Sequence, residues 1–243
     1  MDTNFRNTPI ENFEPSSISN QNSVLRSSFA WMSLAMVLTA ISAFIFASVP
    51  QLTALLLEPT EFGYKLTTLA YIVMFAPLAF VLVIRFGLNK LSLPALIATF
   101  IGYSIVTGIS LSFIFFIYTI GSIYTVFLST AALFAVMAIA GYTTKTDLTK
   151  LGSLLMIGLI GIVIASLINL FMRNSQMDYI ISILGVVIFT GLTAYDVQKI
   201  KNLGMQTGNS LEGRKLGILG ALTLYLDFIN LFMFLLRLFG SRK

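Results

Sequence analysis

The stretch that decides the fold lies near the end of the sequence, where residues 216–239 read LGILGALTLYLDFINLFMFLLRLF. A helix of about 20 apolar residues crosses the hydrocarbon core of a bilayer, and this stretch is long enough. Gly220, Thr223, Asp227 and Asn230 recur within it at the spacing of one helical face. We therefore predict a membrane helix whose small and polar face points into a helix bundle and away from lipid.

Six further apolar runs of spanning length precede this stretch, with short polar breaks between them. The chain is 57% hydrophobic and 10% charged, whereas soluble domains carry about 25% charged residues. The alternating strands of a membrane β-barrel are absent from the pattern. The predicted fold is all-α, a polytopic membrane protein with a seven-transmembrane-helix bundle. The predicted helices cover residues 27–48, 66–86, 93–118, 122–143, 151–172, 178–200 and 216–239.

Residues 1–25 differ from the rest of the chain, because they are polar, rich in Ser and Asn, and without apolar periodicity. We predict a disordered polar tail over 1–25 and a seven-helix transmembrane domain over 26–243. The first apolar run, from Phe29 to Val49, is longer than the roughly 7–15 residues of a signal-peptide core, so it is predicted to span the membrane.

The basic residues in the loops predict the orientation, since cytoplasmic loops are enriched in Lys and Arg. With the tail in the cytoplasm, ten basic residues lie inside, and of the loop residues only Lys65 and Arg173 lie outside. The inside group comprises Arg6, Arg26, Arg85, Lys90, Lys145, Lys150, Lys199, Lys201, Arg214 and Lys215. Arg237, Arg242 and Lys243 lie outside if the last helix crosses fully and inside if it re-enters. The pattern leaves both arrangements open and favours a full crossing.

The composition excludes several classes of function. The chain has no Cys and no His, which removes disulfides, thiol nucleophiles, Cys/His metal sites and His-based catalytic triads. The net charge of +5 is spread over loops and ends with no basic run, so no nucleic-acid partner is expected. The high share of hydrophobic residues instead predicts the lipid bilayer as the partner.

Two acidic residues stand apart from the other eight, which lie in the tail, in predicted loops or at a helix start. Asp196 is in the last turns of the sixth predicted helix, and Asp227 is near the middle of the seventh. A carboxylate at mid-membrane costs about 3 kcal/mol on insertion scales and marks a functional site by default. Two alternatives stay open: Asp196 as an interfacial charge paired with Lys199 or Lys201, and Asp227 as a structural carboxyl bonded to Asn or Tyr.

The sharper hypothesis is that the two carboxyl groups meet, because consecutive helices joined by a basic loop run antiparallel and can be neighbours. In a low dielectric both cannot stay ionised cheaply, so they would share a proton and act as a proton-sensitive latch. Once ionised, they would offer the hard oxygen ligands that suit a transient calcium ion. Thr193, Thr223 and Asn230 form the supporting polar face. Arg85 and Lys90 are either interface anchors or counter-ions of the pair.

Four stretches carry a resemblance to a known family. Residues 224–232 (LYLDFINLF) and 191–200 (GLTAYDVQKI) resemble signatures of the Bax inhibitor-1 (TMBIM) family, and 141–148 (GYTTKTDL) and 108–112 (GISLS) resemble further stretches of it. The resemblance covers about residues 25–240 and is closest to the bacterial YccA-like branch, which implies the bacterial inner membrane.

The resemblance implies a central C-terminal helix and a pH-sensitive calcium leak gated by protonation of an aspartate pair. The aspartates match Asp196 and Asp227. A latch cation on the second helix matches Arg85 or Lys90. Calcium is then the transported ion, and no cofactor is expected. The branch also implies an alternative, a membrane regulatory protein that acts on a partner such as a membrane AAA protease. In that case the tail, residues 1–25, would bind the partner.

An enzyme is the remaining class. Tyr195-Asp196 is similar to the first motif of intramembrane aspartyl proteases. The second motif of those enzymes reads Gly-x-Gly-Asp, whereas Leu224-Tyr225-Leu226 precedes Asp227 here. Their Pro-Ala-Leu motif should follow the second aspartate, and in this chain it occurs only at 94–96, far upstream. We therefore expect no enzymatic activity.

Overall fold

Seven long helices form the bundle, in a computed structural model that describes residues 15–60, 63–88, 90–207 and 210–243. Each of the seven is long and apolar enough to cross a membrane. They are α1 (Pro15–Ser48), α3 (Thr68–Gly87), α4 (Leu93–Leu111), α6 (Ile120–Thr143), α7 (Thr149–Met172), α8 (Ser175–Thr207) and α9 (Leu211–Phe239). The predicted seven-helix membrane fold is confirmed.

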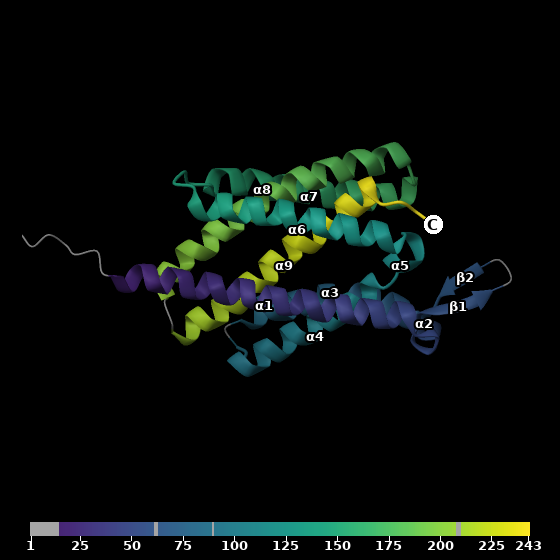
Figure 1. Ribbon diagram of the computed structural model, residues 1–243, viewed down its shortest axis with the longest axis horizontal. Helices are drawn as coiled ribbons and strands as arrows, with labels where there is room; N and C mark the ends of the chain where they lie inside the picture. Colours follow the sequence, from purple (N-terminus) through teal and green to yellow (C-terminus); the bar gives the residue numbers. More distant parts are fainter. Residues whose placement is uncertain (1–14, 61–62, 89, 208–209) are drawn as a thin grey trace, which may run out of the picture.

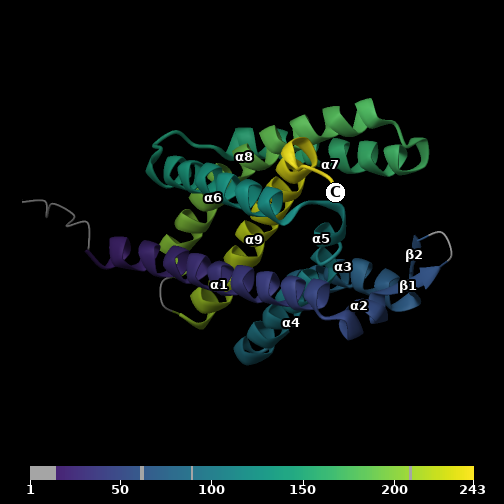
Figure 2. The same cartoon turned by 45° about the vertical axis from the view of Figure 1, so that its right-hand side comes forward.

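The last helix is the centre of the bundle, as predicted. Of its most apolar window 67% is buried, against 11% in α3 and in α7. It packs against α1, α3, α4, α6 and α8, and Figures 1 and 2 show it running diagonally between α1 on one side and α6 on the other. A helix that is surrounded by other helices keeps its polar groups away from lipid, which explains why Asp227 is tolerated there.

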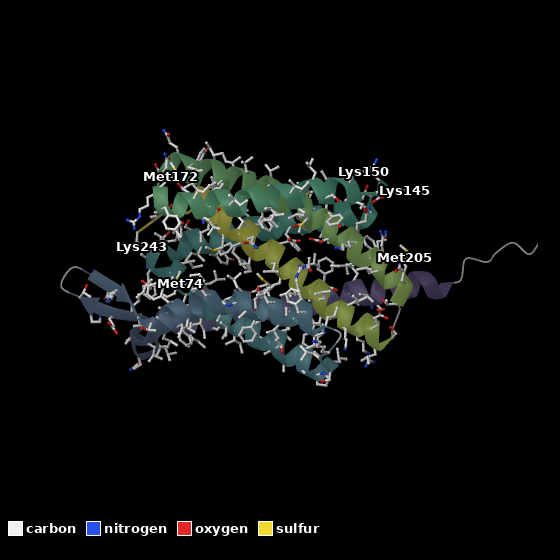
Figure 3. The ribbon with its side chains drawn as sticks, turned by 180° about the vertical axis from the view of Figure 1, so that it is seen from behind. Met74, Lys145, Lys150, Met172, Met205 and Lys243 are labelled. Carbon is white, nitrogen blue, oxygen red and sulfur yellow. The ribbon has the colours of Figure 1, made fainter. Side chains whose placement is uncertain are left out.

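The two ends of the bundle are distinct. We call the end where α1 begins the tail end, and the opposite end, which carries β1 (Leu57–Thr60) and β2 (Gly63–Leu66), the hairpin end. α9 is one continuous helix from the tail end to the hairpin end, the form that a full crossing requires, and it does not turn back as a re-entrant segment would. Figure 3 places Lys145, Lys150 and Met205 at the tail end, and Met172 and Lys243 at the hairpin end.

The connection after the first helix is more ordered than a plain polar break. A short helix, α2 (Pro50–Leu56), leads into the antiparallel β1–β2 hairpin, in which Glu58 is opposite Lys65. The third predicted helix, 93–118, is also interrupted. α4 ends at Leu111, and a single turn, α5 (Ile114–Ile117), follows. Ser112 Oγ donates to the Ile109 carbonyl, a local bond that competes with the helix and marks the break.

α8 and α9 extend beyond their predicted limits of residues 200 and 216. The polar residues between the two apolar runs do not end the helices, because a polar sequence can remain helical outside the membrane when a cap supports its end. Ser210 supplies that cap for α9, where its Oγ accepts a hydrogen bond from Gly213 N.

The predicted tail 1–25 stays a prediction: residues 1–14 lie outside the described residues, and α1 begins at Pro15.

Glycines set the closest helix contacts. A Cβ on Gly141 of α6 would collide with the carbonyl oxygen of Ala194 on α8, and a Cβ on Gly108 of α4 would collide with Thr39 and Ser42 on α1. Backbones approach this closely in membrane bundles only at small residues. The contact at Ala194 matters most for the site, because it fixes the part of α8 that carries Asp196.

Candidate functional site

Asp196 on α8 and Asp227 on α9 meet at the interface of these two helices, with their side chains within hydrogen-bonding reach of each other. Both are buried, with 9% and 4% of the residue exposed. Oδ2 of Asp227 is buried and has no hydrogen-bond partner among the residues that the structure describes. Ionised carboxylates only accept hydrogen bonds, so this contact requires a shared proton or a cation between the two groups.

Close helix packing produces this contact. Gly220 lies two turns before Asp227, and a Cβ there would lie 2.5 Å from Ser28 Oγ and 3.1 Å from Ile200 Cδ1. Ser28 Oγ in turn donates to the Gly217 carbonyl at 3.1 Å, which joins α1 to α9. The small face predicted on the last helix therefore packs against α1 and α8.

The predicted supporting residues bond to their own helices. Thr193 Oγ1 donates to the Phe189 carbonyl at 2.8 Å, Thr223 Oγ1 to Leu219 at 3.1 Å, and Asn230 Nδ2 to Leu226 at 2.8 Å. These bonds use the hydroxyl protons of the two threonines and one of the two amide protons of Asn230. Thr193 is buried and Thr223 and Asn230 are half-buried, and within the described residues no hydrogen bond joins the three to the aspartates.

A cavity of about 180 Å³ lies beside Asp196, and Arg85, Lys199 and Thr223 are among its other lining residues. The positive charge of Arg85 acts on both carboxyl groups, and that of Lys199 acts on Asp196. Arg85 lies in the last turn of α3. Lys90 lies in the turn after α3 and does not line this cavity. Of the two candidate latch cations, the geometry brings only Arg85 to the pair.

Asp196 forms no ion pair at 4.0 Å or less with Lys199 or Lys201 in the part of the chain that the structure describes. Lys201 Nζ donates to the Tyr142 carbonyl at 2.8 Å and lies 4.8 Å from the Tyr142 ring centroid. Lys199 Nζ lies over the ring of Tyr195, 5.6 Å from its centroid. Within the described part of the chain, the ion pair at 4.0 Å or less joins Arg237 to Asp178 instead.

That ion pair ties the same two helices at the hairpin end. Arg237 Nη1 of α9 lies 3.0 Å from Asp178 Oδ1 of α8, with about a third of each side chain exposed. Asp178 is the acidic residue that lies at a predicted helix start, and no partner was expected for it, so the ion pair is a correction. The sequence alone does not indicate this ion pair, because Arg237 and Asp178 are 59 positions apart.

Sequence reasoning also missed a clamp beside Asp196. The side chain of Gln198 accepts a hydrogen bond from Leu148 N and donates one to the Thr146 carbonyl, both at 2.9 Å. It thereby joins the loop between α6 and α7 to α8, half a turn from Asp196. The signal available in the sequence was Gln198 itself, a polar residue on the buried part of α8.

The same loop carries an exposed helix cap. Asp147 Oδ1 accepts hydrogen bonds from Thr149 Oγ1 at 2.6 Å and from Thr149 N at 2.9 Å. The hydroxyl bond first, and the backbone bond second, lower the pKa of the Asp147 carboxyl below its ordinary value, because both stabilise the ionised form. This carboxylate is therefore charged at neutral pH and starts α7.

The oxygen ligands of the pair define what it can bind. Among the described residues, no group of three or more His, Cys, Asp or Glu side chains could hold a metal ion. A resident calcium ion takes about six to eight oxygen ligands, more than two carboxylates provide. Two carboxylates suit an ion that passes and keeps part of its water, which is the chemistry expected for a transient site.

Comparisons with known proteins give a consistent picture. The model of the family described as "Inhibitor of apoptosis-promoting Bax1" matches residues 21–243. The inner membrane protein YbhL of Escherichia coli (strain K12) is 43% identical over 217 residues, which cover 88% of this chain and 90% of that protein. An uncharacterized protein of Rickettsia prowazekii is 41% identical, over 88% of this chain and 88% of that protein. An uncharacterized protein of Borreliella burgdorferi is 43% identical, over 92% of this chain and 94% of that protein.

Proposed function

Because the chain belongs to the Bax inhibitor-1 family, we propose that it is a pH-sensitive calcium leak channel of the bacterial inner membrane, gated by the protonation of Asp196 and Asp227. The observation that carries the proposal is the direct contact of these two buried carboxyl groups on adjacent helices. No catalytic role is proposed for them. The N-terminus lies in the cytoplasm, in line with the excess of basic residues at the tail end.

The described conformation corresponds to the closed gate. On the hairpin side of the pair, aromatic rings fill the space between α6 and α9: Phe127 lies 5.4 Å from Phe228 and 5.9 Å from Phe232, and Phe134 lies 5.5 Å from Phe228, between ring centroids. Such packing leaves no room for a hydrated ion. Calcium therefore passes only after α9 moves relative to its neighbours.

Protonation supplies the reason for that movement. With one shared proton, the pair carries a single negative charge, which Arg85 faces, and the helices stay together. When the proton leaves, two like charges in a low dielectric repel each other and α8 and α9 separate at this point. The freed carboxylate oxygens then attract calcium. Flux is expected to be low at acidic pH and to increase as the pH rises.

Calcium flux into liposomes that contain the purified full chain and an indicator dye tests this function across a range of pH. Wild type is expected to show flux that rises with pH. Asp196→Asn and Asp227→Asn remove the repulsion and keep a neutral polar group, so each should flatten the pH response. The matched control is Glu212→Gln, which removes an exposed carboxylate from the first turn of α9 and leaves the pair intact.

Two results would oppose the proposal in different ways. If both aspartate variants keep the wild-type pH response, the pair is structural and the gate lies elsewhere. If wild type conducts no calcium at any pH, conduction is not the function. Regulation of a membrane partner such as an AAA protease is then tested by deleting residues 1–14, which precede α1.

A further inference from the structure

An apolar groove lies between α1 and α6, in the half of the bundle near the hairpin end. Its volume is about 100 Å³, and it is lined by Met36 and Ala40 of α1, Phe115 of α5, Phe127 of α6, and Ile229 and Phe232 of α9. We call it the α1–α6 groove. Figures 1 and 2 show α1 and α6 on either side of α9 at this place.

The position and chemistry of the groove define the class of its occupant. It lies among membrane-spanning helices, at a depth where the surroundings are hydrocarbon chains, and its lining is almost wholly apolar. Unfilled apolar space loses the dispersion contacts of its walls, so a chain that enters it stabilises the bundle. A partner helix, about 10–12 Å across, does not fit a space of this volume. A segment of a lipid acyl chain, a few methylene groups long, does.

The outer end of the groove carries positive charge. Lys243 Nζ donates to the carbonyl oxygen of Phe115, a lining residue, at 2.7 Å. The backbone holds this lysine in place, because Lys243 N donates to the Ile117 carbonyl at 3.0 Å and Arg242 pairs with Tyr118 in an antiparallel bridge. Figure 3 places Lys243 at the hairpin end of the bundle, where lipid headgroups lie.

From this arrangement we propose that the α1–α6 groove binds one anionic phospholipid, with a segment of one acyl chain in the groove and the phosphate beside Lys243 and Arg242. Lysine binds phosphate as a point charge, and basic residues at a membrane surface select anionic headgroups. The site is separate from the carboxyl pair and does not depend on calcium flux.

Native mass spectrometry of the full chain, purified with equal amounts of phosphatidylglycerol and phosphatidylcholine, tests the site. Wild type is expected to retain one phospholipid and to prefer phosphatidylglycerol by about tenfold, as two basic groups at a surface allow. Ala40→Trp fills the groove from an exposed position and should abolish retention, and Ala40→Leu should weaken it. Ala135→Trp, at an exposed site of α6 outside the groove, should retain the lipid.

A second pair of variants tests the headgroup. Arg242→Gln with Lys243→Gln should keep one bound lipid but lose the preference between the two headgroups. Lys145→Gln with Lys150→Gln, at the tail end, should keep the preference. Equal lipid retention by Ala40→Trp, Ala135→Trp and wild type would overturn the groove assignment, and an unchanged preference in the Arg242/Lys243 variant would overturn the headgroup assignment.

Discussion

The hydroxyl of Tyr225 lies 2.7 Å from Oγ1 of Thr39, a buried contact that joins the last helix to the first. Thr39 Oγ1 also donates to the Ser104 carbonyl on α4 at 2.9 Å. A hydroxyl has one proton to donate, so the Tyr225 hydroxyl is the donor to Thr39. Because residues 225 and 227 point to opposite sides of a helix, this contact fixes α9 to α1 and α4 on the side away from the carboxyl pair.

Tyr225→Phe should therefore destabilise the bundle without changing the pair. The expected loss is about 0.6 kcal/mol, the average for hydrogen bonds between membrane helices, and it should not exceed about 1.7 kcal/mol. Thr39→Val should cost more, because it removes the bond to the Ser104 carbonyl together with the bond to Tyr225. Reversible unfolding in detergent measures both, with Thr125→Val, an exposed hydroxyl bonded to its own helix, as the control. Equal stabilities of Tyr225→Phe and wild type would refute the role of this contact.

Gly141→Ala should disrupt the packing of α6 on α8, because the new Cβ meets the carbonyl oxygen of Ala194. Overpacking of this kind typically costs about 1–3 kcal/mol. Gly161→Ala is the matched control: on α7 no atom lies within 4 Å of the added Cβ. Alanine favours a helix over glycine by up to about 1 kcal/mol, so this control should be neutral or stabilising. Thermal unfolding followed by circular dichroism compares the two, and a smaller loss at Gly141 than at Gly161 would be inconsistent with the close contact.

Arg85→Gln should change the pH response of calcium flux, whereas Lys90→Gln should not. The charge of Arg85 acts on both carboxyl groups and favours their ionised form. Without it, the pair loses its proton less readily, so the rise in flux should move to higher pH. The liposome assay measures this shift. A larger shift in Lys90→Gln would assign the latch to the turn after α3.

Asp147→Ala should loosen the first turn of α7. The depressed pKa of Asp147 means that its cap is present at neutral pH, above the unfolded pKa, and is lost as the pH falls through the folded value. Hydrogen exchange of the amides after Thr149 at neutral pH should be faster in the variant. Asp147→Asn, which keeps an acceptor oxygen, should exchange more slowly than Asp147→Ala. Identical exchange in Asp147→Ala and wild type would show that the cap does not hold this turn.

Much of the architecture could be predicted from residue patterns. The seven apolar runs gave seven helices, and the recurrence of Gly220, Thr223, Asp227 and Asn230 indicated the face that α9 buries. The β1–β2 hairpin could not be predicted, because four-residue strands carry almost no periodic signal and their pairing depends on the turn between them. The interruption after Leu111 depends on a local bond of Ser112 within an otherwise apolar run.

By itself, the sequence determined that the chain is a membrane helix bundle and that Asp196 and Asp227 are its two expensive charges. Both follow from composition and spacing, because the bilayer imposes helix length and penalises charge at every such position. Only the tertiary structure decided which groups meet: Asp196 with Asp227, Arg237 with Asp178, and Tyr225 with Thr39. It also decided that Arg85, and not Lys90, lines the cavity beside Asp196. These partners are far apart in the sequence, and their contacts depend on how glycines such as Gly141 and Gly220 let the helices approach, which no local pattern encodes.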